Sequence, residues 1–396
     1  MRKIKSSIFK INFFNLTMVF ILVINLLFVN IFVYADENNV ATIKENDLYA
    51  KSAILIDADS KRVLYHKNGF EQLPMASTTK IMTCLVALEN SEPQNKVVFS
   101  KYAASKPKVK LGASEGSEFY MKDMLYSLML ESHNDTAVAI AEAVAGSEEN
   151  FAKLMNERAR QMGAFETNFV TANGLDDVNH YTTAYDLAII TSEALKNEEL
   201  LEIIKCANYS FSEINGKGNY NVSNKDAFLT MYEGAIGVKT GFTGKAGYCF
   251  VGAAKRNNKT LISVVLASGW PPDKNFKWKD TIKLMDFGFD NYDYRTIFNS
   301  IDSYKELKIK DGIKKTVNTY INGNVGTLLS DNDKIDYEYI LPEYVEAPVS
   351  ENQVVGKVVI KINGEEFKSL NICTSDNVNK RDFKYCLDKI LSFWMF

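Results

Sequence analysis

Two stretches with the pattern of β-hairpins, far apart in the chain, enclose a long helical region. Residues 49–69 give two short apolar runs around the turn DADSKR, and residues 237–268 give alternating runs around KRNNKT. Between them, residues 77–89, 121–146 and 149–163 carry apolar side chains at helical spacing. Strands at both ends with helices between them favour an antiparallel sheet that carries a helical lobe, an α/β (α+β) fold without the βαβ repeat of a parallel sheet.

After about residue 300 the pattern changes to short alternating runs: YKELKIK, DYEYIL and QVVGKVVIKINGEEFKSLNI. The dipeptide Asn363-Gly364 in the last run is a strong hairpin signal. Before this change, a helix near 279–287 is expected to pack back on the sheet. We therefore predict a main domain over residues 36–299 and a small all-β domain over residues 300–378.

The last segment, residues 379–396, predicts an amphipathic helix. Its apolar residues recur at i, i+3, i+4 spacing, and its other face carries alternating charges. The segment is too short and too charged to span a membrane, yet its Phe-Trp-Met-Phe end suits the boundary between water and lipid. We expect it to lie on a membrane surface, the alternative being a helix that docks on the small β domain.

The N-terminal segment is typical of an export signal. Basic residues precede an apolar run over 16–35, and Val33 and Ala35 provide the small residues required for a cut after Ala35. An uncleaved anchor is the alternative, because about 20 apolar residues can span a bilayer, although Asn25 and Asn30 weaken such a span. Either way we expect the rest of the chain to be exported and to lie peripherally on the outer face of the cytoplasmic membrane.

Charge and cysteine content exclude several classes of partner. The formal net charge is −3 and no long basic block occurs outside the export signal, which argues against nucleic acid as a partner. The five cysteines are widely spaced and form no C-x-x-C motif, so neither a disulfide framework nor a metal site is indicated. We expect mostly buried free thiols and no cofactor.

Ser77 and Lys80 stand three positions apart at the start of a predicted helix, so they share one helix face. A hydroxyl attacks poorly unless a base takes its proton, and a lysine can do so only if its pKa falls well below ~10.4. Burial by the apolar run IMTCLVAL and a second nearby cation would both lower that pKa. The spacing alone is not specific, because Ser7 to Lys10 and Ser105 to Lys108 match it too.

A second polar motif, Ser132-His133-Asn134, places a hydroxyl and an amide between two predicted helical stretches. A literal S-D-N also occurs, beginning at Ser375. That copy lies beyond the small β domain in a polar stretch, where no helix would hold it, and we set it aside.

A third motif, Lys239-Thr240-Gly241, occurs once, at the head of an apolar strand. Glycine there allows a ligand's backbone to lie close, while the lysine and threonine could grip a carboxylate. Lys239 is also the second cation that a neutral Lys80 requires.

S-x-x-K, S-D-N and K-T-G in this order form the signature of penicillin-binding proteins and class A β-lactamases, with the middle motif relaxed here to Ser-His-Asn. Over about residues 45–396 the chain resembles the low-molecular-mass penicillin-binding proteins, serine-type D-alanyl-D-alanine carboxypeptidases of peptidoglycan maturation. The stretches LPMASTTKIMT, ESHNDTA, NGLDDVNHYTTAYDLA and VKTGFTGKAGYCFVGAAKRN carry this resemblance. It implies a β-lactamase/transpeptidase-like fold in which residues 36–299 form the catalytic domain.

The resemblance also implies a role for each motif residue. Ser77 would attack the penultimate D-alanine carbonyl of a peptidoglycan stem peptide that ends in D-Ala-D-Ala, with Lys80 as its base. β-Lactam antibiotics would acylate the same serine. Ser132 would relay the proton to the leaving amine, and Asn134 would hold the substrate amide.

Further implied contacts involve the substrate carboxylate and the developing oxyanion. Lys239 and Thr240 would bind the terminal carboxylate beside Gly241, and the backbone amides of Ser77 and Phe242 would form the oxyanion hole. Members of the family also use an arginine against that carboxylate. Its place falls on Lys277 here, which is a departure, because lysine lacks the bidentate fork of arginine.

Two histidines near these motifs are expected to play lesser parts. His133 occupies a position that varies in the family, so we expect it to supply only shape and polarity, or to be an ordinary solvent-facing residue. His180 matches a recurrent family residue, and we expect a structural role in its loop.

Other functions remain open at this point. A class A β-lactamase would need an E-x-x-L-N loop, which GAFETNFVTANGLDD does not contain, and the G-x-S-x-G pattern at 112–116 lies in a polar stretch rather than at a strand-to-helix turn. A penicillin sensor or wall-binding protein would acylate once or never. A transpeptidase would pass the acyl group to an amine instead of to water.

Overall fold

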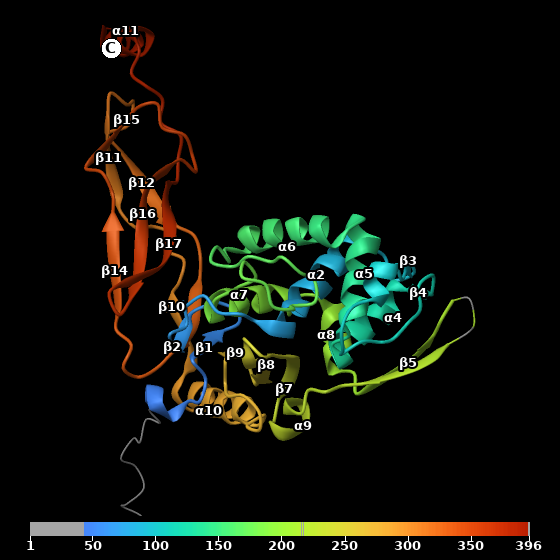
Figure 1. The fold of residues 1–396 in the computed structure, drawn as a ribbon. Helices are drawn as coiled ribbons and strands as arrows, with labels where there is room; N and C mark the ends of the chain where they lie inside the picture. Colours follow the sequence, from blue (N-terminus) through green and yellow to red (C-terminus); the bar gives the residue numbers. More distant parts are fainter. Residues whose placement is uncertain (1–42, 215, 217, 395–396) are drawn as a thin grey trace, which may run out of the picture. The chain divides into compact units, whose positions relative to one another are not determined.

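The computed structural model of the protein describes residues 43–214, 216 and 218–394 (Figure 1). The predicted export signal, residues 1–35, lies outside the described residues. Within the described part, no helix is both long and apolar enough to cross a lipid bilayer.

Five antiparallel strands form the central sheet, in the order β2-β1-β9-β8-β7. They are β1 (Ser52–Asp57), β2 (Val63–Lys67), β7 (Ala235–Thr243), β8 (Gly247–Arg256) and β9 (Lys259–Leu266). Pairing of β1 with β9, from Ser52 opposite Leu266 to Asp57 opposite Leu261, joins the two predicted hairpins into one sheet. This arrangement leaves β7, which carries the K-T-G motif, at an edge.

The segment 237–268 contains one more turn than the sequence predicted. The predicted turn connects β8 and β9, but a second tight turn separates β7 from β8, where Thr243 pairs with Gly247. Gly247 has φ +70, and a Cβ there would lie 2.9 Å from the Gly269 carbonyl oxygen. Glycine therefore allows both the reversal and the close approach.

A helical lobe covers one face of the sheet and α10 (Phe276–Asn291) covers the other (Figure 1). The main elements of the lobe are the short η2 (Ala76–Thr79), α2 (Lys80–Asn90), α4 (Met121–Tyr126), the π-helical η3 (Ser127–Glu131), α5 (Asn134–Ala145), α6 (Glu148–Met162), α7 (Ala184–Ala194) and α8 (Glu198–Lys205). Shorter elements are η1 (Glu45–Asp47), α3 (Lys101–Ala104), α9 (Phe228–Met231), β3 (Lys96–Val98) and β4 (Glu118–Tyr120). The predicted helix 279–287 thus forms the middle of the longer α10.

Side chains of one strand enter two different cores, because successive residues of a strand point to opposite faces. Ile54 and Ile56 of β1 pack in the core shared with the helical lobe. Ala53 and Leu55 pack in the second core, with α10 residues such as Met285. Burial on both faces explains why β1 is apolar without interruption.

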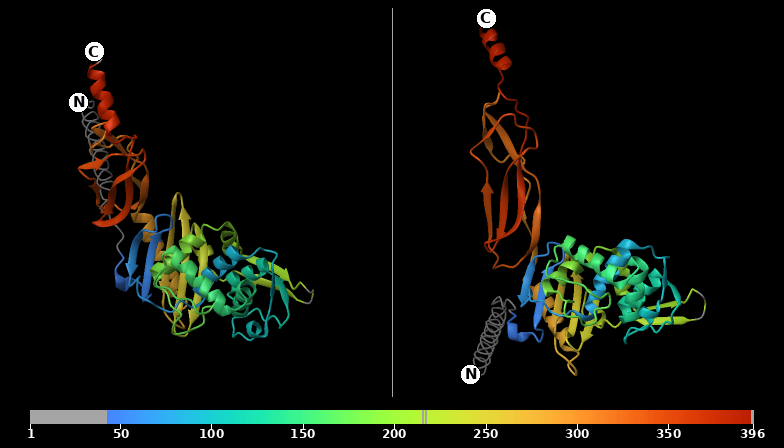
Figure 2. Two further views of the ribbon diagram at one scale, coloured as in Figure 1. Left: turned by 90° about the horizontal axis from the view of Figure 1, so that it is seen from above. Right: turned by 45° about the horizontal axis from the view of Figure 1, so that its top comes forward.

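One hairpin in the middle of the chain was not predicted. It consists of β5 (Asn208–Ser212) and β6 (Asn219–Ser223) and extends away from the helices in both views of Figure 2. Aromatic rings on one side hold it: Phe211 stacks on Tyr220 at 5.5 Å between centroids, and Tyr209 stacks on Tyr126 at 3.8 Å. Its alternating aromatic and polar residues carry the strand signal.

The C-terminal part is rich in β-structure, as predicted. A six-stranded sheet has the order β14-β16-β17-β12-β11-β15, and a separate pair joins β10 to β13. These strands are β10 (Asp293–Phe298), β11 (Glu306–Lys310), β12 (Thr316–Ile321), β13 (Val325–Leu329), β14 (Ile335–Ile340), β15 (Tyr344–Glu346), β16 (Val354–Ile362) and β17 (Glu365–Thr374). Asn363 and Gly364 form the tight turn between β16 and β17, both with positive φ.

The predicted fold class is confirmed: an antiparallel sheet with a helical lobe, a C-terminal β region and a terminal helix. The exact domain limits stay predictions. β10 begins before residue 300, the predicted start of the small β domain, and it pairs with β13 inside that domain.

The terminal helix α11 (Phe383–Trp394) begins after Asp382, whose side chain accepts a hydrogen bond from the Tyr385 backbone amide at 2.7 Å. None of its side chains is buried among the described residues. Phe383, Phe393 and Trp394 are more than three-quarters exposed. The structure therefore gives no support to docking of this helix on the small β domain.

All five cysteines are free. Cys84 and Cys249 are buried, but Cys206 and Cys373 are partly exposed and Cys386 is exposed on α11. The expectation of mostly buried thiols was wrong, because three of these residues lie at surface positions rather than in the two cores around the central sheet.

Candidate active site

A cavity of about 350 Å³ lies where the edge strand β7 meets the helical lobe and α10. Its lining includes seven of the predicted site residues: Ser77, Ser132, Asn134, Thr240, Gly241, Phe242 and Lys277. Lys80 and Lys239 are buried. The described residues contain no group of three or more His, Cys, Asp or Glu side chains that could hold a metal ion.

The amine of Lys80 contacts three other residues of the site. Lys80 is the first residue of α2, fully buried, and its Nζ lies 3.0 Å from Ser77 Oγ, 3.0 Å from Asn134 Oδ1 and 2.5 Å from the Asn173 carbonyl oxygen. The short η2 turn that precedes α2 sets Ser77 against the lysine. One amine thus connects the serine of the first motif to the asparagine of the second.

The surroundings of Lys80 disfavour its charged form. Burial holds its pKa well below the ordinary value, and the nearby charge of Lys239 lowers it further. Asp135 acts in the opposite direction. Its carboxylate already accepts hydrogen bonds from the backbone amides of Leu111 and Gly112, each at 2.8 Å.

Ser132 is held by its backbone rather than by its side chain. It ends the π-helical turn η3 in the left-handed region, with φ 68 and ψ 32. Its hydroxyl is buried and has no hydrogen-bond partner among the described residues, although the residue lines the cavity. A buried hydroxyl without a partner is uncommon in a folded protein, and a bound substrate could supply one.

His133 and Glu131 clamp the turn on either side of Ser132. The imidazole Nδ1 lies 2.8 Å from Ser127 Oγ, and its Nε2 lies 3.3 Å from Glu131 Oε2. Glu131 also pairs with Lys225 at 3.0 Å. His133 is only 5% exposed, so the solvent-facing alternative is wrong. Burial, its main influence, lowers the pKa of His133 and favours the neutral ring.

Lys239 and Gly241 show why the K-T-G strand must approach the serine closely. A Cβ at Gly241 would lie 3.0 Å from the Ser77 backbone nitrogen and 3.1 Å from the Met75 carbonyl oxygen. Lys239 is 3% exposed, and burial lowers its pKa to about 8 against the opposing charge of Asp226. Glycine therefore lets β7 pack on η2, and the strand carries a buried cation beside the serine.

Lys277 reaches the same cavity from α10. Its Nζ donates to the Lys274 carbonyl oxygen at 2.5 Å and lies over the rings of Tyr248 and Trp278, at 4.8 and 4.5 Å from their centroids. Burial and the charge of Lys274 lower its pKa to about 8. The structure thus places Lys277 at the cavity, as the sequence predicted.

His180 ties its loop to the serine turn. Its Nδ1 accepts hydrogen bonds from the backbone amides of Val170 and Thr171, at 3.0 and 3.3 Å, and its Nε2 lies 2.8 Å from Thr79 Oγ1. Burial lowers its pKa to about 4, so the ring is neutral near pH 7. These contacts fit the structural role expected from the sequence.

Several residues in or next to the cavity were not predicted as site residues. Asn173 contributes a backbone carbonyl, which no motif search can find. Two further lysines, Lys108 and Lys225, line the cavity from two separate loops, and Trp278 lines it from α10. Lys108 belongs to the second Ser-x-x-Lys match, yet Ser105 turns away to bond the Tyr102 carbonyl oxygen.

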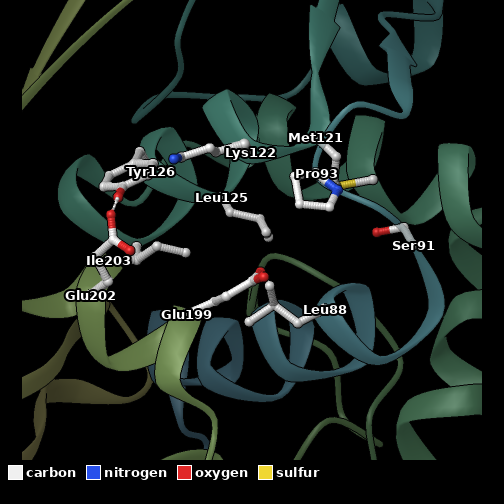
Figure 3. A pocket seen from close by; sticks show the side chains of 10 residues that line it. All are labelled: Leu88, Ser91, Pro93, Met121, Lys122, Leu125, Tyr126, Glu199, Glu202 and Ile203. Atoms are coloured by element: carbon white, nitrogen blue, oxygen red, sulfur yellow. Dashed lines mark hydrogen bonds between the residues drawn. The ribbon is translucent and has the colours of Figure 1, made fainter.

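The competing motifs are not part of a built site. Residues 112–116 form a loop with no strand leading into Ser114. Ser375 is partly exposed and donates to the Asn318 carbonyl oxygen in the C-terminal β region. Figure 3 shows a second cavity, of about 130 Å³, between α2, α4 and α8. Its one serine, Ser91, bonds the Ala87 carbonyl oxygen and has no base beside it.

Comparison with known proteins gives the same family twice over. A family model described as "D-alanyl-D-alanine carboxypeptidase" matches residues 39–269. A second family model, described as "Penicillin-binding protein 5, C-terminal domain", matches residues 292–380. The D-alanyl-D-alanine carboxypeptidase DacF of Bacillus subtilis is 32% identical over 353 residues, which cover 87% of this chain and 90% of that protein.

Solved structures agree. Penicillin binding protein 5 from Haemophilus influenzae has a TM-score of 0.71 and 26% identity, covering 86% of this chain and all of that one. The Streptomyces K15 DD-transpeptidase has a TM-score of 0.58 and 30% identity, covering 62% of this chain and 99% of that one. The cavity with its serine, two buried lysines and K-T-G strand thus stands in a chain that belongs to the D-alanyl-D-alanine carboxypeptidase family of penicillin-binding proteins.

Proposed function

We propose that the protein removes the terminal D-alanine from peptidoglycan stem peptides through an acyl-enzyme on Ser77, with Lys80 as the base. The observation that carries this proposal is the Lys80 amine, fully buried and 3.0 Å from the Ser77 hydroxyl. A buried lysine near a second cation can be neutral, and a neutral amine can accept the serine proton.

The hydrogen bonds of Lys80 can all be made by the neutral form, which its burial favours. A neutral amine has two N–H donors and one lone pair, and Lys80 has three oxygen neighbours. Asn134 Oδ1 and the Asn173 carbonyl can only accept, so they take the two N–H groups. The lone pair then faces the Ser77 hydroxyl, which is the geometry of a base ready to take that proton.

Acylation then follows in balanced steps. Ser77 Oγ bonds to the penultimate D-alanine carbonyl carbon as its proton moves to Lys80, and the oxyanion is received by the backbone amides of Ser77 and Phe242. The C–N bond breaks as the leaving nitrogen gains a proton through Ser132, whose hydroxyl is unpartnered in the structure. Water then cleaves the ester and restores Ser77. A β-lactam enters the first step in the same way and leaves the serine acylated.

The terminal carboxylate of the substrate is assigned to the cationic end of the cavity. Thr240 and Lys277 line it, and Lys239 is buried on the same strand as Thr240. Asn134, already held by Lys80, is assigned to the substrate amide. A requirement for a free carboxylate would confine cleavage to the ends of stem peptides.

The test is release of free D-alanine from a peptide ending in D-Ala-D-Ala, using wild-type protein and Ser77→Ala. Turnover by the wild type and none by the variant, with labelled penicillin attached only to the wild type, is the expected result. Absence of both turnover and penicillin labelling in folded wild-type protein would refute the proposal.

Transfer of the acyl group to an amine is the second candidate, because the catalytic part resembles a structure described as a DD-transpeptidase. Adding glycylglycine or D-alanine as acceptor to the same assay separates the two reactions. A new peptide bond formed at the expense of hydrolysis would identify transpeptidation, whereas unchanged D-alanine release without an aminolysis product identifies the carboxypeptidase.

We also propose that the enzyme is exported and that α11 attaches it to the outer face of the cytoplasmic membrane. Exposed apolar side chains on this helix, together with its lysines, suit an interfacial position. Truncation before residue 380 should release the mature protein from anionic vesicles while D-alanine release continues. Continued vesicle binding by the truncated protein would show that α11 is not the anchor.

A further inference from the structure

Asp226 is a buried carboxylate that belongs to none of the three signature motifs. It precedes α9 and is 8% exposed. Its Oδ1 accepts a hydrogen bond from the Phe228 backbone amide at 3.0 Å, whereas Oδ2 is buried and has no hydrogen-bond partner among the described residues. A buried carboxylate with one unpaired oxygen is costly unless a nearby positive charge compensates it.

Packing places the segment that follows Asp226 against the strands and the helix that border the carboxylate subsite. The Phe228 ring meets Phe250 edge-on, at 5.6 Å between centroids, and Phe250 lies opposite the K-T-G motif in the pairing of β7 with β8. Phe250 also meets Trp278 at 4.5 Å, next to Lys277 on α10. Asp226 thus stands at the junction of α9, β7 and α10, and its neighbour Lys225 lines the cavity.

The electrostatic influence is mutual. Burial raises the pKa of Asp226 to about 7, while Lys239 and Lys277 both hold it down. Asp226 in turn raises the pKa of Lys239 against burial. The other charged or titratable groups of this neighbourhood are Lys80 on α2, Cys249 on β8, Lys274 before α10, and Lys225 with its partner Glu131. Neither Asp226 nor Lys239 takes part in an ion pair within 4.0 Å in the described chain, so Asp226 acts on Lys239 through its charge at longer range.

We propose that Asp226 is a positioning residue of the carboxylate subsite, which keeps Lys239 protonated and thereby keeps Lys80 neutral. The inference rests on the roles proposed above for Lys239 and Lys80. The three groups act in sequence. The negative charge of Asp226 favours the protonated form of Lys239, and the positive charge of Lys239 disfavours protonation of Lys80. Lys239 therefore stays protonated, and able to bind the substrate carboxylate, to a higher pH than it would if burial alone acted on it.

The Asp226→Asn variant tests this, because asparagine keeps the shape and the acceptor oxygen but cannot ionise. KM and kcat for D-alanine release are measured from pH 6 to pH 9. At pH 6 the two proteins should share one KM, since the Asp226 carboxyl is already protonated there. Above pH 7 the rise in KM should begin about one pH unit earlier in the variant, giving a KM about tenfold higher at pH 9.

Asp123→Asn is the matched control. Asp123 is also a partly buried aspartate with a raised pKa, but it accepts the Tyr209 hydroxyl and does not line the cavity. Its KM should follow the wild type at every pH. An Asp226→Asn variant whose KM is unchanged, or is raised by one factor at all pH values, would overturn the inference, because a purely structural loss does not depend on the ionisation of residue 226.

A second measurement needs no variant, in case Asp226→Asn does not fold. Wild-type protein labelled with ¹³C at the aspartate carboxyl carbons is titrated by NMR, free and after acylation by benzylpenicillin. One aspartate should titrate near pH 7 and move to higher pH when the antibiotic's carboxylate occupies the lysine pair. The inference would be overturned if no aspartate titrates near pH 7, or if the pKa of the one that does is the same in the free and the acylated protein. Wild-type turnover and its loss in Ser77→Ala, recorded alongside, show separately whether the proposed function holds.

Discussion

The lysines around Ser77 and those of the C-terminal β region occupy opposite environments. Lys80 and Lys239 are buried, have no ion-pair partner within 4.0 Å in the described chain, and their pKa values are lowered. Lys361 lies 2.7 Å from Glu338 on an exposed sheet face, and its pKa is raised by that partner. The same side chain is therefore a potential proton acceptor in one place and a fixed surface cation in the other, and burial without a carboxylate within ion-pair distance makes the difference.

The largest expected effect comes from removing the buried amine. Lys80→Ala should reduce acylation by penicillin about 10³-fold, because a general base typically contributes 10²–10⁴. Lys80→Arg should not restore the rate, since arginine stays protonated. Stopped-flow labelling with a fluorescent penicillin measures both, and circular dichroism checks that the fold persists.

Lys361→Ala is the control from the β region, and its acylation rate should equal that of the wild type. Labelling of Lys80→Ala at the wild-type rate would show that the buried amine is not the base, and the two lysine environments would then not differ in function.

Two glycines with similar backbone angles give the next effect. Gly174 has φ +83, and a Cβ there would lie 2.0 Å from the Ala76 carbonyl oxygen in the serine turn, whereas Gly364 has φ +87 with nothing within 4 Å. Both alanine variants bear the cost of a left-handed residue, about 1–2 kcal/mol. Only Gly174→Ala must also push η2 aside, so we expect about a 10²-fold loss of D-alanine release, because small misplacements of catalytic groups cost that much.

Gly364→Ala should keep full turnover with a slightly lower melting temperature. Equal turnover of the two glycine variants would show that contact between residue 174 and the serine turn is unimportant for the site.

The smallest effect concerns stability and pH. Lys80 binds a proton readily in the unfolded chain, near its ordinary value of 10.5, but not in the folded protein, where its pKa is well below that value. The unfolded state therefore binds more protons, and the contribution of Lys80 to stability increases with pH between the lowered pKa and 10.5, by about 1.4 kcal/mol per pH unit.

Denaturation midpoints of wild type and Lys80→Met, compared between pH 7 and pH 9, measure this slope. Their difference should grow with pH in favour of the wild type. Lys361→Met should run parallel to the wild type, and a parallel Lys80→Met would show that residue 80 is charged in both states.

The sequence predicted which motif residues meet at one cavity, because the S-x-x-K, S-x-N and K-T-G patterns can be recognised from the side chains themselves. Ser77, Asn134 and Thr240 line one cavity as that interpretation requires. It did not predict the Asn173 carbonyl, which acts through the backbone, or Asp226, whose role depends on how α9 packs against β7 and α10. Such groups are brought together only by tertiary structure.

The fold shows the same division. The apolar runs of β1, β8 and β9 were readable because burial on both faces of the sheet selects them. The β5–β6 hairpin was missed although Tyr209 and Phe211 alternate with polar residues, since its strands are rich in Asn and Ser, which are less frequent in sheets. Ring stacking between the strands compensates for that composition.

The free thiols differ in exposure, so one of them, Cys386, can be labelled selectively with a dye. Burial raises the pKa of Cys84 and, to about 12, that of Cys249, so neither forms a reactive thiolate near neutral pH. Cys386 is exposed on α11, among the apolar side chains that we expect to meet lipid. After Cys206 and Cys373 are changed to serine, an environment-sensitive dye on Cys386 would report how deeply the terminal helix enters a bilayer while the same molecules turn over substrate.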